Sequence, residues 1–305
     1  MKNRPALFTN ILILLMIIGF SVFMWKKTKI QDTAKGIELT GNLPRHGNVL
    51  FAQERNINTA GVIQAIALND TLLVAASDDR ILVYMHNGSK LADYRTGSYI
   101  SDLCIAGDTL FVLHPGGLSI YNNRLELTSK WEPCSENSYY CGIAVSDKRV
   151  FVSDADNKLI VTYTREGDFD GFIMHKNRFV IPSANFPLAV NGDTLYAGNA
   201  GAHKIELYNT VNGRFIRDFG ITGSAEGAFS GCCNPCGIII STEGKIITAE
   251  KGLARIARFN TDGSYNALLI SNKMLNESTL APKIAWLEDR LVVALGKTIT
   301  WYKQK

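Results

Sequence analysis

Residues 141–163 read CGIAVSDKRVFVSDADNKLIVTY, and this stretch decides the fold. It holds three short runs rich in Val, Ile, Leu and aromatic residues, which are separated by polar residues typical of turns. Apolar residues that alternate with a period of two, interrupted by turn residues, predict β-strands rather than a helix. The stretch therefore predicts three consecutive antiparallel strands, the last of which ends at Tyr163.

The same pattern occurs six times between residue 60 and the C-terminus. Each copy closes on an aromatic residue, and these aromatics follow one another at intervals of 37 to 51 residues: Tyr84, Tyr121, Tyr163, Tyr208, Phe259 and Tyr302. Between most copies we expect a fourth strand after a glycine turn, at residues 90–94, 169–174, 214–219 and 265–270. Four strands in each repeat of about 40–50 residues are the signature of a β-propeller blade.

The sixth copy reaches the C-terminus with only three strands. We expect its missing outer strand to come from the N-terminal side of the body, near residues 48–52, because this would join the first and last blades and remove an exposed edge. An open seven-bladed arrangement lacks the residues. The sequence thus predicts an all-β fold, a six-bladed β-propeller over residues 48–305, with no helix in that range.

The N-terminus predicts a membrane anchor. Residues 6–25 contain no charged residue, and a helix of 20 residues spans about 30 Å, the thickness of the hydrocarbon core. Trp25 is followed by two lysines, which is typical of an interfacial anchor. The bulky residues at the end of the segment do not resemble a signal-peptide cleavage site. We therefore expect a short tail at 1–5, one transmembrane signal anchor at 6–25 and a polar stalk at 26–47.

Charge is distributed unevenly along the 305 residues. The net charge is +4, but residues 1–29 contain five basic residues and no acidic one, so the remainder is close to neutral. A near-neutral body argues against nucleic-acid binding, which needs a basic face. With 46% hydrophobic and 20% charged residues, the composition also excludes a disordered chain.

Two elements of the repeats resemble a known family. Residues 154–160, DADNKLI, resemble the Asp-x-x-Asn-x-Arg-Ile core of NHL-repeat propellers, with Lys158 in place of the arginine. Residues 229–235, FSGCCNP, are similar to a subgroup of bacterial NHL-type propellers that carries a Gly-Cys-Cys-Asn-Pro element. This resemblance implies no enzymatic activity, and it implies a body on the extracytoplasmic side of a bacterial membrane.

The cysteines form the first group of candidate site residues. When the copies are aligned on their closing aromatics, Cys141 and Cys236 both start an innermost strand beside the central channel. Cys232 and Cys233 lie in the loop just before, and Cys134 lies in the corresponding loop of the third copy. We therefore expect these five cysteines to gather around one mouth of the channel. Cys104 stands in an apolar run and is expected to be an ordinary buried thiol.

Three interpretations of this cysteine cluster remain open. Structural disulfides, such as Cys134–Cys141, suit an oxidising compartment. A redox pair at Cys233 and Cys236 has the C-x-x-C spacing, in which the first thiol is often activated. A metal site using Cys232, Cys233, Cys236 and His203 would favour copper, zinc or an iron–sulfur centre, because thiolates are soft ligands.

Polar residues at the turns form a second candidate site. Asp154, Asn199 and Glu250 follow the second strands of blades three, four and five, and Lys251 and Arg255 extend the cluster. Oxygen ligands of this kind suit Ca²⁺, and propeller lactonases hold a divalent cation in the channel with Glu, Asn and Asp. The same residue types at turns also bond to nearby backbone groups, which is their commoner role.

The sequence favours a non-enzymatic scaffold that is anchored in the membrane and binds a protein or a small ligand through its propeller loops. One alternative is a redox or metal-linked role of the cysteine cluster in membrane electron transfer, and another is a channel-metal hydrolase. No cofactor is firmly implied. The charges that flank residues 6–25 leave the orientation nearly tied. The cysteines and the family resemblance favour a single-pass protein of the bacterial inner membrane with its body in the periplasm.

Overall fold

The structure, a computed structural model, describes residues 51–304. The predicted tail, membrane segment and stalk, residues 1–47, lie outside the described residues. Within residues 51–304 no helix is long and apolar enough to cross a membrane. The helices in this range are two short 3₁₀ turns, η2 (Ala200–Ala202) and η3 (Asn272–Leu275).

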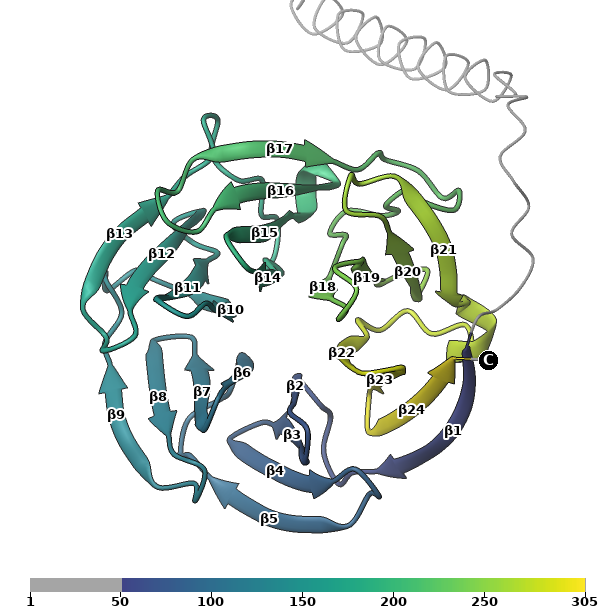
Figure 1. Cartoon of the computed structure of the whole chain (residues 1–305), viewed down its shortest axis with the longest axis horizontal. Coiled ribbons are helices and arrows are strands. Elements are labelled where there is room, and N and C mark those ends of the chain that lie inside the picture. Colours follow the sequence, from purple (N-terminus) through teal and green to yellow (C-terminus); the bar gives the residue numbers. More distant parts are fainter. Residues whose placement is uncertain (1–50, 305) are drawn as a thin grey trace, which may run out of the picture. The chain divides into compact units, whose positions relative to one another are not determined.

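Six four-stranded antiparallel sheets stand in a ring around a central channel (Figure 1). This arrangement confirms the predicted six-bladed propeller. Blade 1 consists of β2 (Ala65–Leu68), β3 (Leu72–Ser77), β4 (Arg80–Met85) and β5 (Lys90–Arg95). Blade 2 consists of β6 (Asp102–Ala106), β7 (Thr109–His114), β8 (Gly117–Tyr121) and β9 (Leu127–Trp131). Blade 3 consists of β10 (Tyr140–Val145), β11 (Arg149–Asp154), β12 (Leu159–Thr164) and β13 (Phe169–Ile173).

The remaining three blades repeat this order, with the first strand innermost. Blade 4 consists of β14 (Leu188–Asn191), β15 (Thr194–Asn199), β16 (Lys204–Asn209) and β17 (Phe215–Phe219). Blade 5 consists of β18 (Gly237–Ile240), β19 (Ile246–Glu250), β20 (Arg255–Phe259) and β21 (Tyr265–Ile270). Blade 6 consists of β22 (Lys283–Leu287), β23 (Arg290–Leu295), β24 (Thr298–Gln304) and, as its outer strand, β1 (Phe51–Asn58).

The strand β1 closes the ring. It pairs antiparallel with β24, from Phe51 opposite Gln304 to Asn58 opposite Thr298. The predicted closure by the N-terminal side of the body is therefore confirmed, although the paired strand continues to Asn58 rather than ending near residue 52. The outer strand β9 of blade 2 had no counterpart among the predicted fourth strands.

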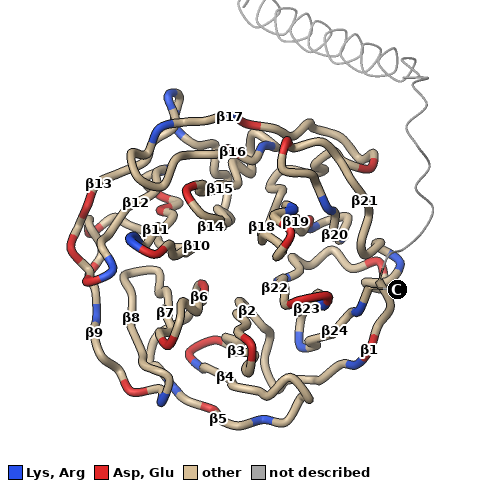
Figure 2. The backbone as a smooth tube through the Cα atoms, viewed as in Figure 1, with Lys and Arg blue, Asp and Glu red and all other residues tan. Residues whose placement is uncertain are grey.

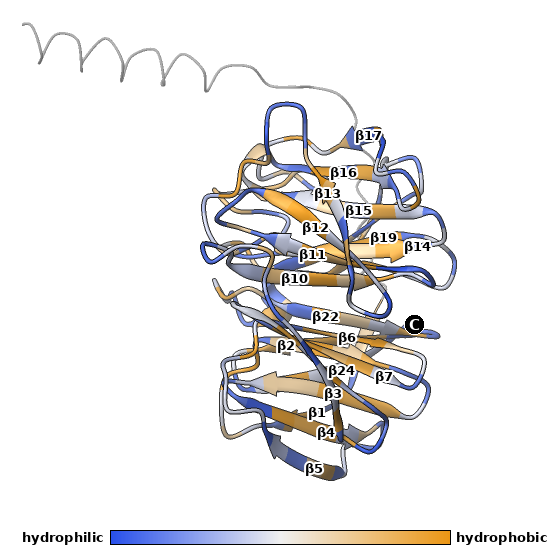
Figure 3. Ribbon diagram, turned by 90° about the vertical axis from the view of Figure 1, so that its left-hand side faces the viewer, coloured by the Kyte–Doolittle hydropathy of each residue, from blue (hydrophilic) through white to orange (hydrophobic). Residues whose placement is uncertain are grey.

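The hydrophobic core is divided among the six interfaces between neighbouring blades. Six apolar clusters each draw their residues from two adjacent blades. In every cluster the closing aromatic of one blade packs against the blade before it: Tyr84, Tyr121, Tyr163, Tyr208, Phe259 and Tyr302. Figure 3 shows the apolar residues concentrated in the strands and the hydrophilic residues in the turns. In Figure 2 most charged residues lie on turns and outer strands.

Phe51 provides a test of ring closure, because it is fully buried and its ring lies 5.7 Å from that of Trp286 on the innermost strand of blade 6. We predict that Phe51→Ala lowers the free energy of unfolding by about 3–5 kcal/mol, the usual cost of removing a buried phenyl group. Phe172→Ala, on an outer strand and 48% exposed, is the matched control and should cost less than about 1 kcal/mol. Urea unfolding of the full chain in detergent micelles measures both. Equal losses would mean that β1 does not hold the ring together.

Candidate functional site

The innermost strands of all six blades line one cavity of about 680 Å³ along the central channel. Each of these strands is paired on one side only, so its other edge presents backbone N–H and C=O groups to the channel. The side chains that line the cavity are mostly Ala, Val, Ile and Leu. The channel therefore combines apolar side chains with backbone polar groups and a few polar side chains, and its volume lies in the range of small-molecule sites.

Asp102 is the carboxylate of the channel wall. Its Oδ1 accepts the Leu103 N–H (2.9 Å) and its Oδ2 accepts the N–H of Ile143 in the next blade (3.0 Å). Burial raises the pKa of Asp102 from 3.8 to about 6, against the effect of these two hydrogen bonds and of the nearby Lys283 ammonium. Asp102 and Lys283 both line the cavity. Sequence reasoning missed both, because each stands at the start of an otherwise apolar strand.

Three thiols also line the channel, on three different blades: Cys104, Cys141 and Cys236. Burial raises the pKa of each of them to about 12. They are therefore protonated at neutral pH, and a protonated thiol is a weak nucleophile and a weak metal ligand. Cys141 and Cys236 lie beside the channel as the repeat alignment predicts, and Cys104, expected as an ordinary buried thiol, packs against the core between blades 2 and 3 and also lines the channel.

The three turn residues of the second candidate site occupy equivalent positions, because Asp154, Asn199 and Glu250 each end the second strand of their blade. Each accepts a hydrogen bond from a backbone N–H of the loop that leads into that blade. The donors are Tyr139 to Asp154 (3.1 Å), Val180 to Asn199 (2.8 Å) and Ser230 to Glu250 (3.1 Å). Asp154 also accepts the Asn157 N–H of its own turn (3.1 Å). These side chains therefore hold loops in place.

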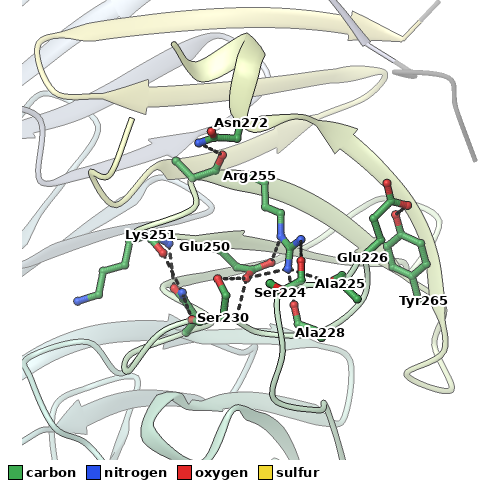
Figure 4. A network of polar contacts seen from close by, with 12 residues as sticks. Ser224, Ala225, Glu226, Ala228, Ser230, Glu250, Lys251, Arg255, Tyr265 and Asn272 are labelled. Atoms are coloured by element: carbon green, nitrogen blue, oxygen red, sulfur yellow. Dashed lines mark hydrogen bonds and ion pairs between the residues drawn. The ribbon is translucent and has the colours of Figure 1, made fainter. Parts of the chain in front are cut away.

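Glu250 forms a buried ion pair with Arg255, which Figure 4 shows within its network. Arg255 Nε lies 2.6 Å from Glu250 Oε1, and both side chains are at most 7% exposed. The Arg255 guanidinium donates further to the carbonyls of Ser224 and Ala225. Its Nη2 also donates to the Ala228 carbonyl, so this arginine joins the loop before blade 5 to the blade itself.

The loop before blade 5 brings two cysteines into contact, since the Sγ atoms of Cys232 and Cys233 lie 3.1 Å apart. All six cysteines are free thiols. His203, predicted as a possible ligand beside them, instead contacts the Gly231 carbonyl through Nε2. Cys134 lies in the loop before blade 3, where its N–H donates to the Tyr140 hydroxyl (2.9 Å).

No three His, Cys, Asp or Glu side chains within residues 51–304 are arranged to hold a metal ion. Asp154, Asn199 and Glu250 belong to separate blades, and each is engaged by a different loop. Lys251 follows Glu250, and its backbone N–H donates to Asn234 Oδ1 (2.9 Å). The polar residues predicted as one channel site thus lie in three local networks.

Comparisons with known proteins support the fold. No protein-family model matches the sequence, and no curated protein matches it. Among solved structures, the chain is similar to virginiamycin B lyase from Staphylococcus aureus, with 14% identity, 84% of this chain and 100% of that chain covered, and a TM-score of 0.62. A catalytically inactive variant of that enzyme with quinupristin gives 14% identity, the same coverage and a TM-score of 0.60.

The chain is also similar to the WD40 β-propeller domain of Doa1, with 10% identity, 84% of this chain and 97% of that chain covered, and a TM-score of 0.57. Similarity at 10–14% identity shows the propeller fold alone.

Replacing Glu250 tests whether this residue has a structural role, as its ion pair with Arg255 indicates, or a catalytic one. We predict that Glu250→Ala lowers the free energy of unfolding by about 3–5 kcal/mol, because it leaves the Arg255 charge buried without its partner. Glu243→Ala, at an exposed turn of the same blade, is the control and should change stability by less than about 0.5 kcal/mol. Thermal and urea unfolding measure both variants. A Glu250→Ala protein as stable as the control would return Glu250 to the list of candidate functional groups.

Proposed function

We propose that the chain is a membrane-anchored, extracytoplasmic propeller of the NHL type that binds a small amphipathic ligand in its central channel and does not transform it. The observation that carries this proposal is the cavity of about 680 Å³, whose lining combines mostly apolar side chains, backbone polar groups and two charged side chains, Asp102 and Lys283. Small-molecule sites commonly combine an apolar lining with a few polar groups that orient the ligand. The ligand that fits best has an apolar body and at least one charged group.

The contacts around the channel support binding rather than catalysis. General acid–base or metal chemistry needs a group that is free to act on a substrate. Asp154, Asn199 and Glu250 already accept backbone hydrogen bonds, and the three channel thiols are protonated. Asp102 differs from these residues because it lines the cavity, but both of its oxygens also accept a backbone N–H. This carboxylate can still attract a cationic group by charge.

The proposal of membrane anchoring rests on the sequence, and the proposed NHL relationship rests on the sequence and on one turn of the structure. The uncharged segment 6–25 supports an uncleaved anchor in the bacterial inner membrane, with the body in the periplasm. The NHL-type relationship draws support from the Asp154 turn, in which Asp154 Oδ2 accepts the Asn157 Nδ2–H (2.8 Å). The aspartate and asparagine of the family's repeat core thus bond to each other and close this turn.

A ligand screen tests the channel. Small apolar amines, apolar acids and short apolar peptides are added to the full chain in detergent micelles, and the change in Tm is recorded. We expect ligands that raise the Tm of the wild type to lose this effect in Ala184→Trp, because Ala184 is an exposed residue of the cavity lining and the larger side chain would occupy the cavity. The effect should also be lost in Asp102→Asn or Lys283→Met. Asp108→Asn, on an exposed turn of the blade that contains Asp102, is the control. Ligands that stabilise Ala184→Trp as well as the wild type would place the site elsewhere.

The pKa of Asp102 gives this binding a pH dependence. Above pH 6 the Asp102 side chain is a carboxylate, and below it the side chain is neutral, since burial raises its pKa to about 6. An apolar amine should therefore bind about tenfold more weakly at pH 5 than at pH 7, in proportion to the ionised fraction. The dependence should disappear in Asp102→Asn. Isothermal titration calorimetry across this range measures it, and an unchanged profile in the variant would exclude Asp102 from the site.

The orientation in the membrane has its own test. Cys134 and Cys232 are the exposed thiols of the described chain. In intact spheroplasts, a membrane-impermeant maleimide should label these two cysteines, and prior reduction should increase the labelling if an oxidising compartment has converted them to disulfides. A variant that lacks both thiols is the control for specificity. Labelling that requires lysis of the membrane, and that then needs no reductant, would reverse the proposed topology.

A further inference from the structure

The loop before blade 5 holds two thiols that differ sharply in exposure. Cys232 is exposed, whereas Cys233 is only 4% exposed. Their sulfur atoms are 3.1 Å apart, which is within contact distance and longer than the ~2.05 Å of a disulfide bond. An exposed sulfur can meet an incoming molecule, and a buried sulfur beside it can complete a reaction that the first one starts.

The segment around the two thiols is held from both sides. Asn234 is 1% exposed, and its side chain donates to the Lys251 carbonyl (2.9 Å) while accepting the Lys251 N–H (2.9 Å). On the other side, Asn185 Nδ2 donates to the Cys233 carbonyl (2.7 Å). The backbone that carries Cys233 is therefore fixed between the connection from blade 3 to blade 4 and the turn that follows Glu250.

The same contacts bring thiolate-stabilising groups to Cys233. Burial acts to raise the pKa of the Cys233 thiol, but hydrogen bonds from Ser183 and Cys232 and the Lys251 ammonium outweigh it, so the pKa lies below its ordinary value. The pKa of Cys232 is raised, first by its hydrogen bond with Cys233 and then by the charge of Cys233. When the pair loses one proton, the negative charge is therefore favoured on Cys233 and the remaining proton on Cys232. Thiolates are the reactive species in disulfide exchange.

We propose that Cys232 and Cys233 form a thiol–disulfide exchange site, which reduces an incoming disulfide and becomes a disulfide between two adjacent residues. Cys232 passes its proton to Cys233, and its sulfur attacks one sulfur of the incoming disulfide. The S–S bond breaks, and the first leaving thiolate departs, which yields a mixed disulfide on Cys232. Cys233 then loses its proton to solvent and attacks the Cys232 sulfur, which expels the second thiolate. Two electrons pass from the two cysteines to the incoming disulfide, which becomes two thiols.

This site differs from the C-x-x-C pair suggested by spacing. Cys236 lies beside the first residue of strand β18 and lines the channel, and burial raises the pKa of its thiol to about 12. The sulfur contact within the loop joins Cys232 to Cys233. The inference does not depend on a channel ligand, because the exchange takes place at an exposed loop residue.

Oxidised glutathione is a suitable disulfide probe. The full chain in detergent micelles is reduced, freed of reductant, treated with oxidised glutathione, acid-quenched and digested without reduction for mass spectrometry. We expect the peptide that contains residues 232–236 to lose two hydrogens and to carry no glutathione. Cys233→Ser should keep one glutathione on Cys232, and Cys232→Ser should react about tenfold or more slowly, since its remaining thiol is buried. Cys134→Ser, which removes the other exposed thiol, should behave as the wild type.

Cys236→Ala decides between the two possible pairs. We expect it to lose two hydrogens as the wild type does, because Cys236 takes no part in the exchange. If this variant instead retains glutathione, the disulfide involves Cys236 and the proposal is wrong. A wild type that keeps a stable glutathione adduct would overturn it equally. Phenylarsine oxide, which bridges two neighbouring thiols, tests the wild type without any substitution, and it should protect Cys232 and Cys233 together from later alkylation.

Lys251 is a positioning residue for the thiolate and can be tested separately. Lys251→Met should slow the reaction with oxidised glutathione by about tenfold at pH 7, because the thiolate loses its neighbouring positive charge. Lys251→Arg should restore most of the rate, whereas a purely structural role would leave both variants equally slow. Lys273→Met, which removes an exposed lysine of η3, is the control. An unchanged rate in Lys251→Met would remove Lys251 from the site.

Discussion

Every blade of this propeller depends on its two neighbours, because each sheet carries apolar side chains on both faces. The six apolar clusters all lie between adjacent blades, so no blade contains a complete core of its own. An open ring would leave the apolar faces of the first and last blades in water. Exposed apolar area costs about 25 cal/mol per Å², so the open ring would be less stable. The pairing of β1 with β24 removes this cost by making the last blade complete. Ring closure is therefore the condition on which the other interfaces depend.

The same packing decides where chemistry can occur. Side chains along the strands are used to fill the interfaces, which leaves the channel wall and the connecting loops for other roles. On the channel wall, Asp102 bridges blades 2 and 3 through the Ile143 N–H and also supplies the negative charge of the cavity. In the loops, a polar residue at the end of a second strand holds the loop before it, as Asp154, Asn199 and Glu250 do in three successive blades.

The repeats made most of the fold predictable from the sequence. The closing aromatics marked the third strand of each blade, and all six are buried at equivalent interfaces. The closing strand was also predictable, since the sixth copy was one strand short. Strand β9 was not predicted, because Leu127–Trp131 reads LTSKW and shows no alternation of apolar residues. Four of these five residues are not buried. An outer strand needs little apolar surface, so its sequence carries little of the alternating pattern.

Residues of the candidate site could be placed from the sequence only where they occupy equivalent positions in the repeats. Asp154, Asn199 and Glu250 all end a second strand, so their positions could be inferred, although the loops that they bind could not. The cysteine that contacts Cys233 could not be inferred from the repeats, because strand β18 begins at Gly237 and Cys236 lines the channel. Cys232 and Cys233 remain in a loop whose path is set by Asn185, Asn234 and Lys251, which come from three different segments. The C-x-x-C spacing would indicate that the sulfur atoms of Cys233 and Cys236 lie close together if both residues stood in one regular element. Here the loop ends at Cys236 and strand β18 begins at Gly237, so the spacing did not identify the contact.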